Sequence, residues 1–209
     1  MVYRLAIFDF DGTLADSAGW LLRNVNPVAD RYGFERIPHD AVDELRGLDG
    51  RALLRRLNIP MWKLPLIARH MHALMSRDAD EIVLFDGAAE LLGTLRAGGI
   101  ALAIVSSNSE ANVRRVLGPA NAALIGHYGC GAGLFGKGAR FRQAVRRAGV
   151  RPGEAIGIGD ELRDIDAAEA EGLASGAVTW GYATPTVLRA RRPTFVFDSM
   201  AAIAEALVR

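Results

Sequence analysis

The second part of the chain alternates between short apolar runs and amphipathic stretches, and this alternation constrains the fold more than any other feature. From Asp86 onward it predicts helices at 86–97, 109–117, 138–148, 164–171, 185–190 and 199–208, strands at 100–105, 154–158, 174–179 and 194–197, and a short apolar run at 122–126. Alternating strands and helices are typical of a parallel sheet with helices on both faces. The run Ile100–Val105 is apolar at every position, as expected for a strand buried on both sides. We therefore predict an α/β fold with a doubly wound parallel sheet.

The first part of the chain has a different pattern. An apolar run from Val2 to Phe10 predicts one more strand, but the sequence from about Asp16 to Ile82 has helical periodicity with glycine and proline breaks. This stretch predicts about four short helices and no convincing strand. We interpret it as an insertion: a Rossmann-like core domain at 1–15 and 86–209, and a small all-helical cap domain at 16–85 positioned over the carboxyl edge of the sheet.

Composition excludes several classes of function. The 209 residues carry a formal net charge of +1, so no global field favours nucleic acid or an anionic membrane as a partner. The single cysteine, Cys130, excludes an intrachain disulfide and has no histidine motif beside it, so we give it no role. We see no leader sequence and no run that could span a bilayer, and we expect a cytoplasmic protein, monomeric or homodimeric.

Two carboxylates stand two residues apart where the first strand is expected to end, in Asp9-Phe10-Asp11-Gly12-Thr13. Side chains alternate along a strand, so Asp9 and Asp11 can point the same way if the strand continues, and Gly12 then allows a sharp turn. Two negative charges this close persist only if a cation lies between them or one carboxyl keeps its proton. The plain structural alternative is a turn followed by a helix cap, but capping needs one acid and not two.

Polar groups also follow the other apolar strands. Ser106-Ser107-Asn108 comes after strand 100–105, and Gly159-Asp160, with Asp164 close behind, comes after strand 154–158. Between them, Phe135-Gly136-Lys137-Gly138 places a lysine in a glycine-rich loop before a helix, in a chain that has only one other lysine. Each group alone has a plain explanation: a serine as helix cap, a solvated lysine, acids at a helix N-terminus. Their occurrence together, in this order, favours one shared functional role over a separate structural role for each group.

These motifs resemble those of the haloacid dehalogenase superfamily, and within it the phosphoglycolate phosphatase-like proteins with an α-helical cap. The resemblance covers residues 1–15 and about 86–209, with the first and last motifs the most specific. The helical segment resembles the family's cap in placement and size only. One departure is that Lys137 is followed by Gly138 and not by the proline often found there, which puts the orientation of the lysine in doubt but not its charge.

The resemblance implies a role for each motif. Asp9 would be the nucleophile that forms an aspartyl phosphate, and Asp11 the acid and base that serves the leaving alcohol and then the attacking water. The implied cofactor is Mg²⁺, which prefers oxygen ligands, and the implied ligands are Asp9, the Asp11 carbonyl, Asp160 and Asp164, the last directly or through another group. Ser106 and Lys137 would stabilise the transferring phosphoryl group.

Further residues are candidates for binding the phosphate or the rest of the substrate. Gly12 allows close backbone approach, and Thr13, Ser107 and Asn108 lie beside the implied catalytic residues. In the helical segment, Arg46 and Arg51 are weaker candidates, because an arginine can hold an acidic group with two hydrogen bonds. Gly19 and Trp20 are others. The plain alternative for all of these helical-segment residues is an exposed helix end.

The sequence therefore predicts a magnesium-dependent phosphatase acting on a small phosphorylated metabolite, with phosphoglycolate or a sugar phosphate as the first candidates. A sugar phosphomutase would share every core motif and differ only in transferring the phosphoryl group to a second hydroxyl. A phospho-accepting regulatory domain also gathers acids, a hydroxyl and a lysine around magnesium, but it needs no helical insertion over its site. A dehalogenase would need neither Asp11 nor magnesium.

Overall fold

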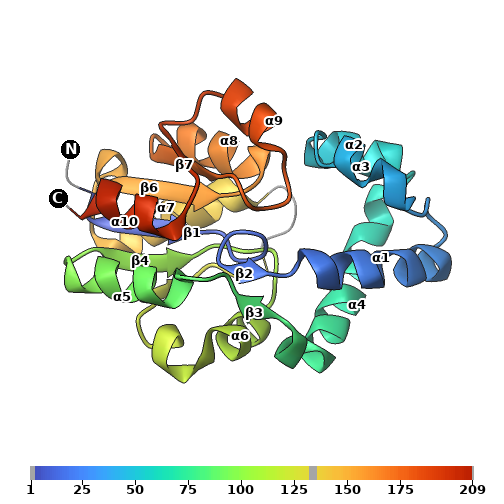
Figure 1. Ribbon diagram of the computed structural model, residues 1–209, viewed down its shortest axis with the longest axis horizontal. Coiled ribbons are helices and arrows are strands. Elements are labelled where there is room, and N and C mark those ends of the chain that lie inside the picture. The colour runs from blue at the N-terminus through green and yellow to red at the C-terminus, as the bar shows by residue number, and fades with distance from the viewer. Residues whose placement is uncertain (1–2, 132–135, 209) are drawn as a thin grey trace.

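A sheet of six parallel strands lies at the centre of the computed structural model, which describes residues 3–131 and 136–208 (Figure 1). The strand order is β5-β4-β1-β6-β7-β8. The strands are β1 (Leu5–Phe8), β4 (Ala101–Ile104), β5 (His127–Tyr128), β6 (Ala155–Gly159), β7 (Ala174–Val178) and β8 (Phe195–Phe197). Phe8, at the end of β1, is in register with Ile104 of β4 and Ile158 of β6. The carboxyl ends of the three central strands therefore lie side by side.

Helices cover both faces of the sheet, which explains why the central strands are apolar throughout. Along β1, Ala6 and Phe8 belong to the core that includes α5 (Ala88–Ala97) and α10 (Met200–Leu207). Leu5 and Ile7 belong to a second core, with α7 (Lys137–Ala148) and the C-terminal part of the next helix, α8 (Leu162–Ala170). Side chains alternate between the faces of a strand, so a strand covered on both sides must be apolar at every position. The predicted α/β, Rossmann-like fold is confirmed.

Helices α1 to α4 lie to one side of the sheet, on the right in Figure 1. We call residues 18–77, which contain them, the helical segment. Its helices are α1 (Ala18–Tyr32), α2 (Val42–Leu45), α3 (Gly50–Arg56) and α4 (Leu64–Arg77), with short 3₁₀ turns at His39–Ala41 and Met61–Lys63. Trp20 of α1 and Met75 of α4 are buried in the same core as α5, so the segment packs directly on the sheet domain.

Two short strands that the sequence did not predict join the ends of the helical segment. β2 (Ala15–Asp16) pairs antiparallel with β3 (Val83–Leu84), with Ala15 opposite Leu84. The chain that leaves the sheet after β1 is thereby held beside the chain that returns to it. Two residues are too few to show the alternation that identifies a strand. The domain boundaries predicted at 15–16 and 85–86 fall on or next to this pair.

Several predicted element ends are wrong by a few residues. β1 stops at Phe8 instead of Phe10, because the backbone turns there. α6 (Glu110–Ala122) runs beyond the predicted end at 117: the chain kinks at Gly118, where φ is 71°, and then continues as helix. The remaining elements are α9 (Pro185–Ala190) and 3₁₀ turns at Ala79–Glu81 and Pro152–Glu154. Val2 and Phe135, which we placed in the first strand and the lysine loop, lie outside the described residues.

Within 3–131 and 136–208, no helix combines the length and the apolar character that crossing a membrane requires.

Candidate active site

A tight turn, and not a continued strand, presents the first two acids. The Phe10 carbonyl accepts hydrogen bonds from the backbone N–H groups of Leu14 and Ala15, both at 2.9 Å. β1 does not continue through Asp11, so the arrangement in which a continuing strand would point Asp9 and Asp11 the same way does not form. Asp9 contacts Lys137, while Asp11 accepts a hydrogen bond from Asn108, so the two carboxylates have different partners.

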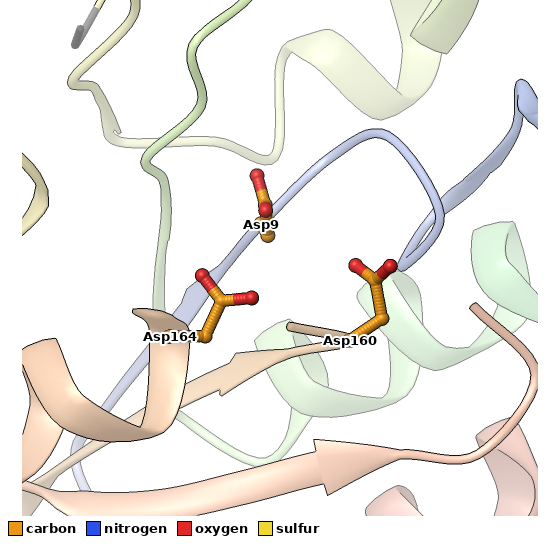
Figure 2. Close-up of side chains that lie close together, drawn as sticks. All are labelled: Asp9, Asp160 and Asp164. Atoms are coloured by element: carbon orange, nitrogen blue, oxygen red, sulfur yellow. The ribbon is translucent and has the colours of Figure 1, made fainter. Parts of the chain in front are cut away.

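Two strand ends and the start of one helix bring three carboxylates together at the carboxyl edge of the sheet (Figure 2). Asp9 follows β1, Asp160 follows β6, and Asp164 lies in the first turn of α8. One oxygen from each lies within 4.8 Å of the others, and all three residues are buried. Acids from two distant parts of the sequence, position 9 and positions 160 and 164, meet here because the parallel strands end at one edge. The sequence predicted this convergence.

Lys137 lies against this cluster. Its Nζ is 2.6 Å from Asp9 Oδ2 and also donates a hydrogen bond to Asp164 Oδ1, and the residue is only 6% exposed. Burial lowers the pKa of Lys137, but the two carboxylates outweigh that effect and raise it, so the ammonium keeps its charge. Lys137 is the first residue of α7 and not part of a loop before it, because Gly136 takes the N-cap position. The plain alternative of a solvated lysine is excluded.

The cluster gathers three buried carboxylates around one lysine, so a bound cation or a retained proton would offset the excess negative charge. Burial raises the pKa of Asp9, and Lys137 opposes that shift. For Asp160, burial and the neighbouring Glu161 and Asp9 carboxylates raise the pKa well above its usual value. Groups with raised pKa values because of burial and like charge are stabilised in their ionised form by a bound cation. Carboxylate oxygens at this spacing fit a hard divalent ion such as Mg²⁺.

Arg163 adds positive charge at the same place. Its guanidinium forms a hydrogen-bonded ion pair with Glu161, and its side chain is 25% exposed. The arginine lowers the pKa of Asp9, although less than Lys137 does. Arg163 lies between Asp160 and Asp164 in the sequence, and the motif pattern predicts no role for it. The feature of the sequence that could have indicated a role for Arg163 is its position between two acids, Glu161 and Asp164.

Gly12 and Thr13 both touch Asp160. Gly12 has φ of +79°, and a Cβ built there would lie 2.4 Å from Asp160 Oδ2, so any larger residue would collide with this carboxylate. The Thr13 hydroxyl donates a hydrogen bond to Asp160 Oδ1 at 2.6 Å. Both residues therefore position an acid of the cluster, a contact that the sequence pattern did not reveal.

Ser106, Ser107 and Asn108 follow β4, as predicted. Ser106 is 1% exposed and its hydroxyl accepts a hydrogen bond from the Asn108 N–H at 3.0 Å, while Ser107 is half-buried. The cap of α6 is Ser109, whose hydroxyl accepts from the Asn112 N–H. Ser106 is therefore not needed as a helix cap. Burial raises the pKa of Asp11, and hydrogen bonds with the Ser17 hydroxyl and the Asn108 amide oppose that shift.

Asp164 also has the structural role that we gave as its alternative. Its Oδ2 accepts a hydrogen bond from the Glu161 N–H at 3.0 Å, which caps the N-terminus of α8. Its other oxygen accepts from Lys137. Asp164 thus joins the start of a helix to the buried lysine.

The arginine candidates of the helical segment lie away from the carboxylates. Arg46 donates to the backbone carbonyls of Tyr182 at 2.9 Å and Gly181 at 3.2 Å, so it links the α2–α3 loop to the loop after β7. Arg51 is exposed in the first turn of α3, where it lines a surface cavity with neighbours from its own segment. Trp20 is 4% exposed and donates to Asp78, so it is part of the packing between α1 and α4.

The loop after β7 is a part of the site that sequence reasoning missed. The Tyr182 N–H donates to Asp160 Oδ2 at 2.8 Å, and the Tyr182 hydroxyl lies 2.7 Å from Ser17 Oγ. A Cβ at Gly181 would lie 2.2 Å from Asp160 Cβ, so only glycine fits there. The loop follows β7 (Ala174–Val178) at the same edge of the sheet as the other motifs, but it contains no acid or lysine that would indicate a site in the sequence.

The parallel sheet and the acids, lysine and hydroxyl groups at its carboxyl edge define an α/β protein with a Rossmann-like core and a candidate catalytic site. The chain belongs to the haloacid dehalogenase-like hydrolase family, whose family model matches residues 6–178. This confirms the resemblance seen in the motifs.

Individual proteins similar to this chain include a phosphatase and a kinase. The chain is 30% identical to a phosphoglycolate phosphatase of Synechococcus elongatus, over 97% of this chain and 96% of that protein. It is 28% identical to the tyrosine-protein kinase PtkA of Mycobacterium tuberculosis, over 86% of this chain but only 63% of that protein. The crystal structure of a predicted phosphatase from Clostridium acetobutylicum has a TM-score of 0.83 at 20% identity and covers 99% of both chains, which supports the fold.

Proposed function

We propose that the protein is a magnesium-dependent phosphatase that hydrolyses a small phosphorylated metabolite through an aspartyl phosphate on Asp9. The observation that carries the proposal is the placement of Asp9: a buried carboxylate next to a buried lysine, within 4.8 Å of two further acids, at the carboxyl edge of the sheet. The similarity to a phosphoglycolate phosphatase supports a small acidic phosphate ester as the substrate.

In this mechanism an oxygen of Asp9 attacks phosphorus, and the bond from phosphorus to the leaving oxygen breaks. Asp9 Oδ1 accepts a hydrogen bond from the Phe10 N–H at 2.7 Å, and Oδ2 contacts Lys137, so the carboxylate is held in one orientation. Fixing the nucleophile in this way lowers the entropic part of the barrier. Lys137 also gives the attacked phosphoryl group a fixed positive charge.

Asp11 transfers a proton in each of the two steps. Its carboxyl gives a proton to the leaving alcohol in the first step, and its carboxylate takes one from water when water attacks the aspartyl phosphate. Burial raises the pKa of this group above its usual value, which favours a carboxyl that can hold a proton. Ser106 and Ser107 supply hydrogen-bond donors to the phosphoryl oxygens, whereas the Thr13 hydroxyl already donates to Asp160 and the Asn108 amide to Asp11.

We assign the ion to Asp9, Asp160 and the backbone carbonyl of Asp11. When bound, Mg²⁺ would neutralise the charge of the phosphate and of the acids around it. Both oxygens of Asp164 already accept hydrogen bonds, from Lys137 and from the Glu161 N–H. The oxygens of Asp9 and Asp160 also accept hydrogen bonds, so these contacts do not set Asp164 apart from the ion, and we assign it both to holding Lys137 and to the ion, directly or through another group.

Residues 16–85 act in this proposal as a cap domain that excludes water from the first step and opens to release product. The part of the substrate other than its phosphate group is recognised on the side of the site that faces this cap domain. Arg46 and Arg51 stay predictions as substrate contacts, and Arg46 already donates hydrogen bonds to the core.

The test is phosphate release from p-nitrophenyl phosphate and from a panel of phosphorylated metabolites, with and without Mg²⁺. We expect Asp9→Asn to lower turnover by at least about 10⁴-fold, because the amide is not a nucleophile. Chelation of divalent ions should abolish wild-type activity in the same assay. Near-wild-type turnover of Asp9→Asn would overturn the assignment. Analysis of the products from a hexose 1-phosphate separates hydrolysis from transfer to a second hydroxyl.

A further inference from the structure

A buried side chain outside the motifs joins Asp11 to the helical segment. Asn112, in the first turn of α6, is 2% exposed and has no role in the site as described so far. Its Nδ2 donates to Asn108 Oδ1 at 3.2 Å and to the backbone carbonyl of His72, in α4, at 3.0 Å. An amide NH₂ group has two hydrogens, and both are used here.

Asn112 determines which way the amide of Asn108 faces. Asn108 Oδ1 lies 2.8 Å from the Ser109 N–H and 3.2 Å from Asn112 Nδ2, and both of these groups are donors. The atom facing two donors must be the oxygen. The NH₂ group of Asn108 then faces the other way, where it donates to Asp11 Oδ2 at 3.1 Å and contacts the sulfur of Met75 in α4.

This orientation makes the two oxygens of Asp11 different. Oδ2 accepts the hydrogen bond from Asn108, whereas Oδ1 is buried and has no hydrogen-bond partner among the described residues. A buried polar atom without a partner is rare and is often found at a functional site. Oδ1 is thus the oxygen left for the substrate. If the Asn108 amide turned round, its carbonyl would face the Asp11 carboxylate and repel it.

We propose that Asn112 is a positioning residue for the reaction: it fixes the Asn108 amide and, through it, keeps Asp11 Oδ1 directed to the leaving group while α4 is docked against α6. The inference rests on the proposed function, because it takes Asp11 as the group that protonates the leaving alcohol. His72 and Met75 belong to the helical segment, so the same contacts link the position of that segment to the orientation of the acid.

The test uses leaving groups that differ in their need for a proton. An acid matters for expelling an alkoxide or phenoxide and matters little for dinitrophenoxide, which is stable as an anion. We expect Asn112→Ala to lower kcat/KM by about 30-fold for phenyl phosphate and by less than about 3-fold for 2,4-dinitrophenyl phosphate, within the range that acid catalysis contributes. In an Asp11→Asn background the same substitution should have no effect that depends on the leaving group.

Arg115→Ala is the matched control. Arg115 also joins α6 to the helical segment, through hydrogen bonds to the Ser76 carbonyl at 2.8 Å and Asp80 at 2.9 Å, but neither partner belongs to the Asn108 network. It should change kcat/KM for both esters by the same small factor. If Asn112→Ala does not fold, Asn112→Asp keeps the volume and removes both donors, and it should show the same dependence on the leaving group.

The outcomes are distinct. An equal loss with both esters, or no loss, in an active protein would overturn the positioning role and leave the proposed function intact. A wild-type protein that releases no phosphate from either ester in the presence of Mg²⁺ would overturn the proposed function, and this inference with it.

Discussion

The carboxylate cluster and the helical segment differ in how their charges are paired. In the cluster, Lys137 and Asp9 have side chains that are 7% and 4% exposed, and their charges meet inside the protein. In the helical segment, ion pairs such as Arg36–Asp30, with side chains 62% and 56% exposed, lie in solvent. A solvent-exposed pair contributes about 0.2–1 kcal/mol to stability, whereas removing one partner of a buried pair costs about 3–5 kcal/mol.

This difference shows which part of the chain the reaction constrains. The acids and the lysine at the sheet edge hold one another in place, so a change to one alters the charge felt by all the others. The helical segment is joined to that edge by a small number of contacts, including those of Arg46 and Asn112. Substitutions should therefore have graded effects, largest in the cluster and smallest on the exposed surface of the segment.

The two lysines of the chain give the sharpest test of the comparison. We expect Lys137→Met to lower kcat by about 10²–10³-fold, because it removes a fixed charge beside the phosphoryl group. It should also lower the thermal stability, since Asp9 and Asp164 lose their shared partner. Steady-state kinetics and thermal unfolding measure the two effects.

Lys63→Met is the control from the helical segment. Lys63 donates a hydrogen bond to the Tyr32 carbonyl at 2.6 Å and contacts none of the acids in the cluster. Its kcat should stay within about 2-fold of wild type, as for a substitution away from the reacting groups. Equal losses in the two variants would contradict the difference between the two regions.

Arg46 tests a contact between the regions, and its effect should be intermediate. Arg46→Ala removes the hydrogen bonds to the carbonyls of Gly181 and Tyr182, whose loop also holds Asp160. We expect kcat/KM to fall by about 10-fold, in line with the loss of one or two charge-assisted hydrogen bonds from a half-exposed side chain. Arg36→Ala, which breaks an exposed pair within the segment, is the control and should leave kcat/KM unchanged. A loss as large as that of Lys137→Met would place Arg46 in direct contact with the reacting groups.

The sequence could predict the cluster because its members follow apolar strands that end at one edge. Asp9, Asp160 and Asp164 meet for that reason, and the fold follows from the same alternation of strands and helices. The local turns were harder to predict from the sequence. The strand ends at Phe8 because the Phe10 carbonyl binds the next backbone N–H groups, and neither this turn nor the two-residue strands β2 and β3 leave a periodic pattern.

The sequence could not reveal partners that depend on how helices pack. Asn112 lies in the first turn of α6, four residues after Asn108, which precedes the helix, and its second acceptor, the His72 carbonyl, comes from α4. Tyr182 reaches Asp160 through its backbone N–H, which every residue except proline possesses. Residue identity alone does not signal such contacts.

The smallest effect is expected on the surface of the helical segment, where Trp62 is 70% exposed. Trp62→Ser removes little buried apolar surface and only the contact of its ring with the Lys63 ammonium, so we expect kcat unchanged and the free energy of unfolding lowered by less than about 0.5–1 kcal/mol. Trp20→Ala is the matched comparison, because Trp20 is 4% exposed and bonds to Asp78; it should cost about 3–5 kcal/mol. Denaturant unfolding measures both. A Trp62 variant as unstable as the Trp20 variant would mean that the outer surface of the segment is covered in solution, and the contrast between the two regions would then hold for the cluster alone.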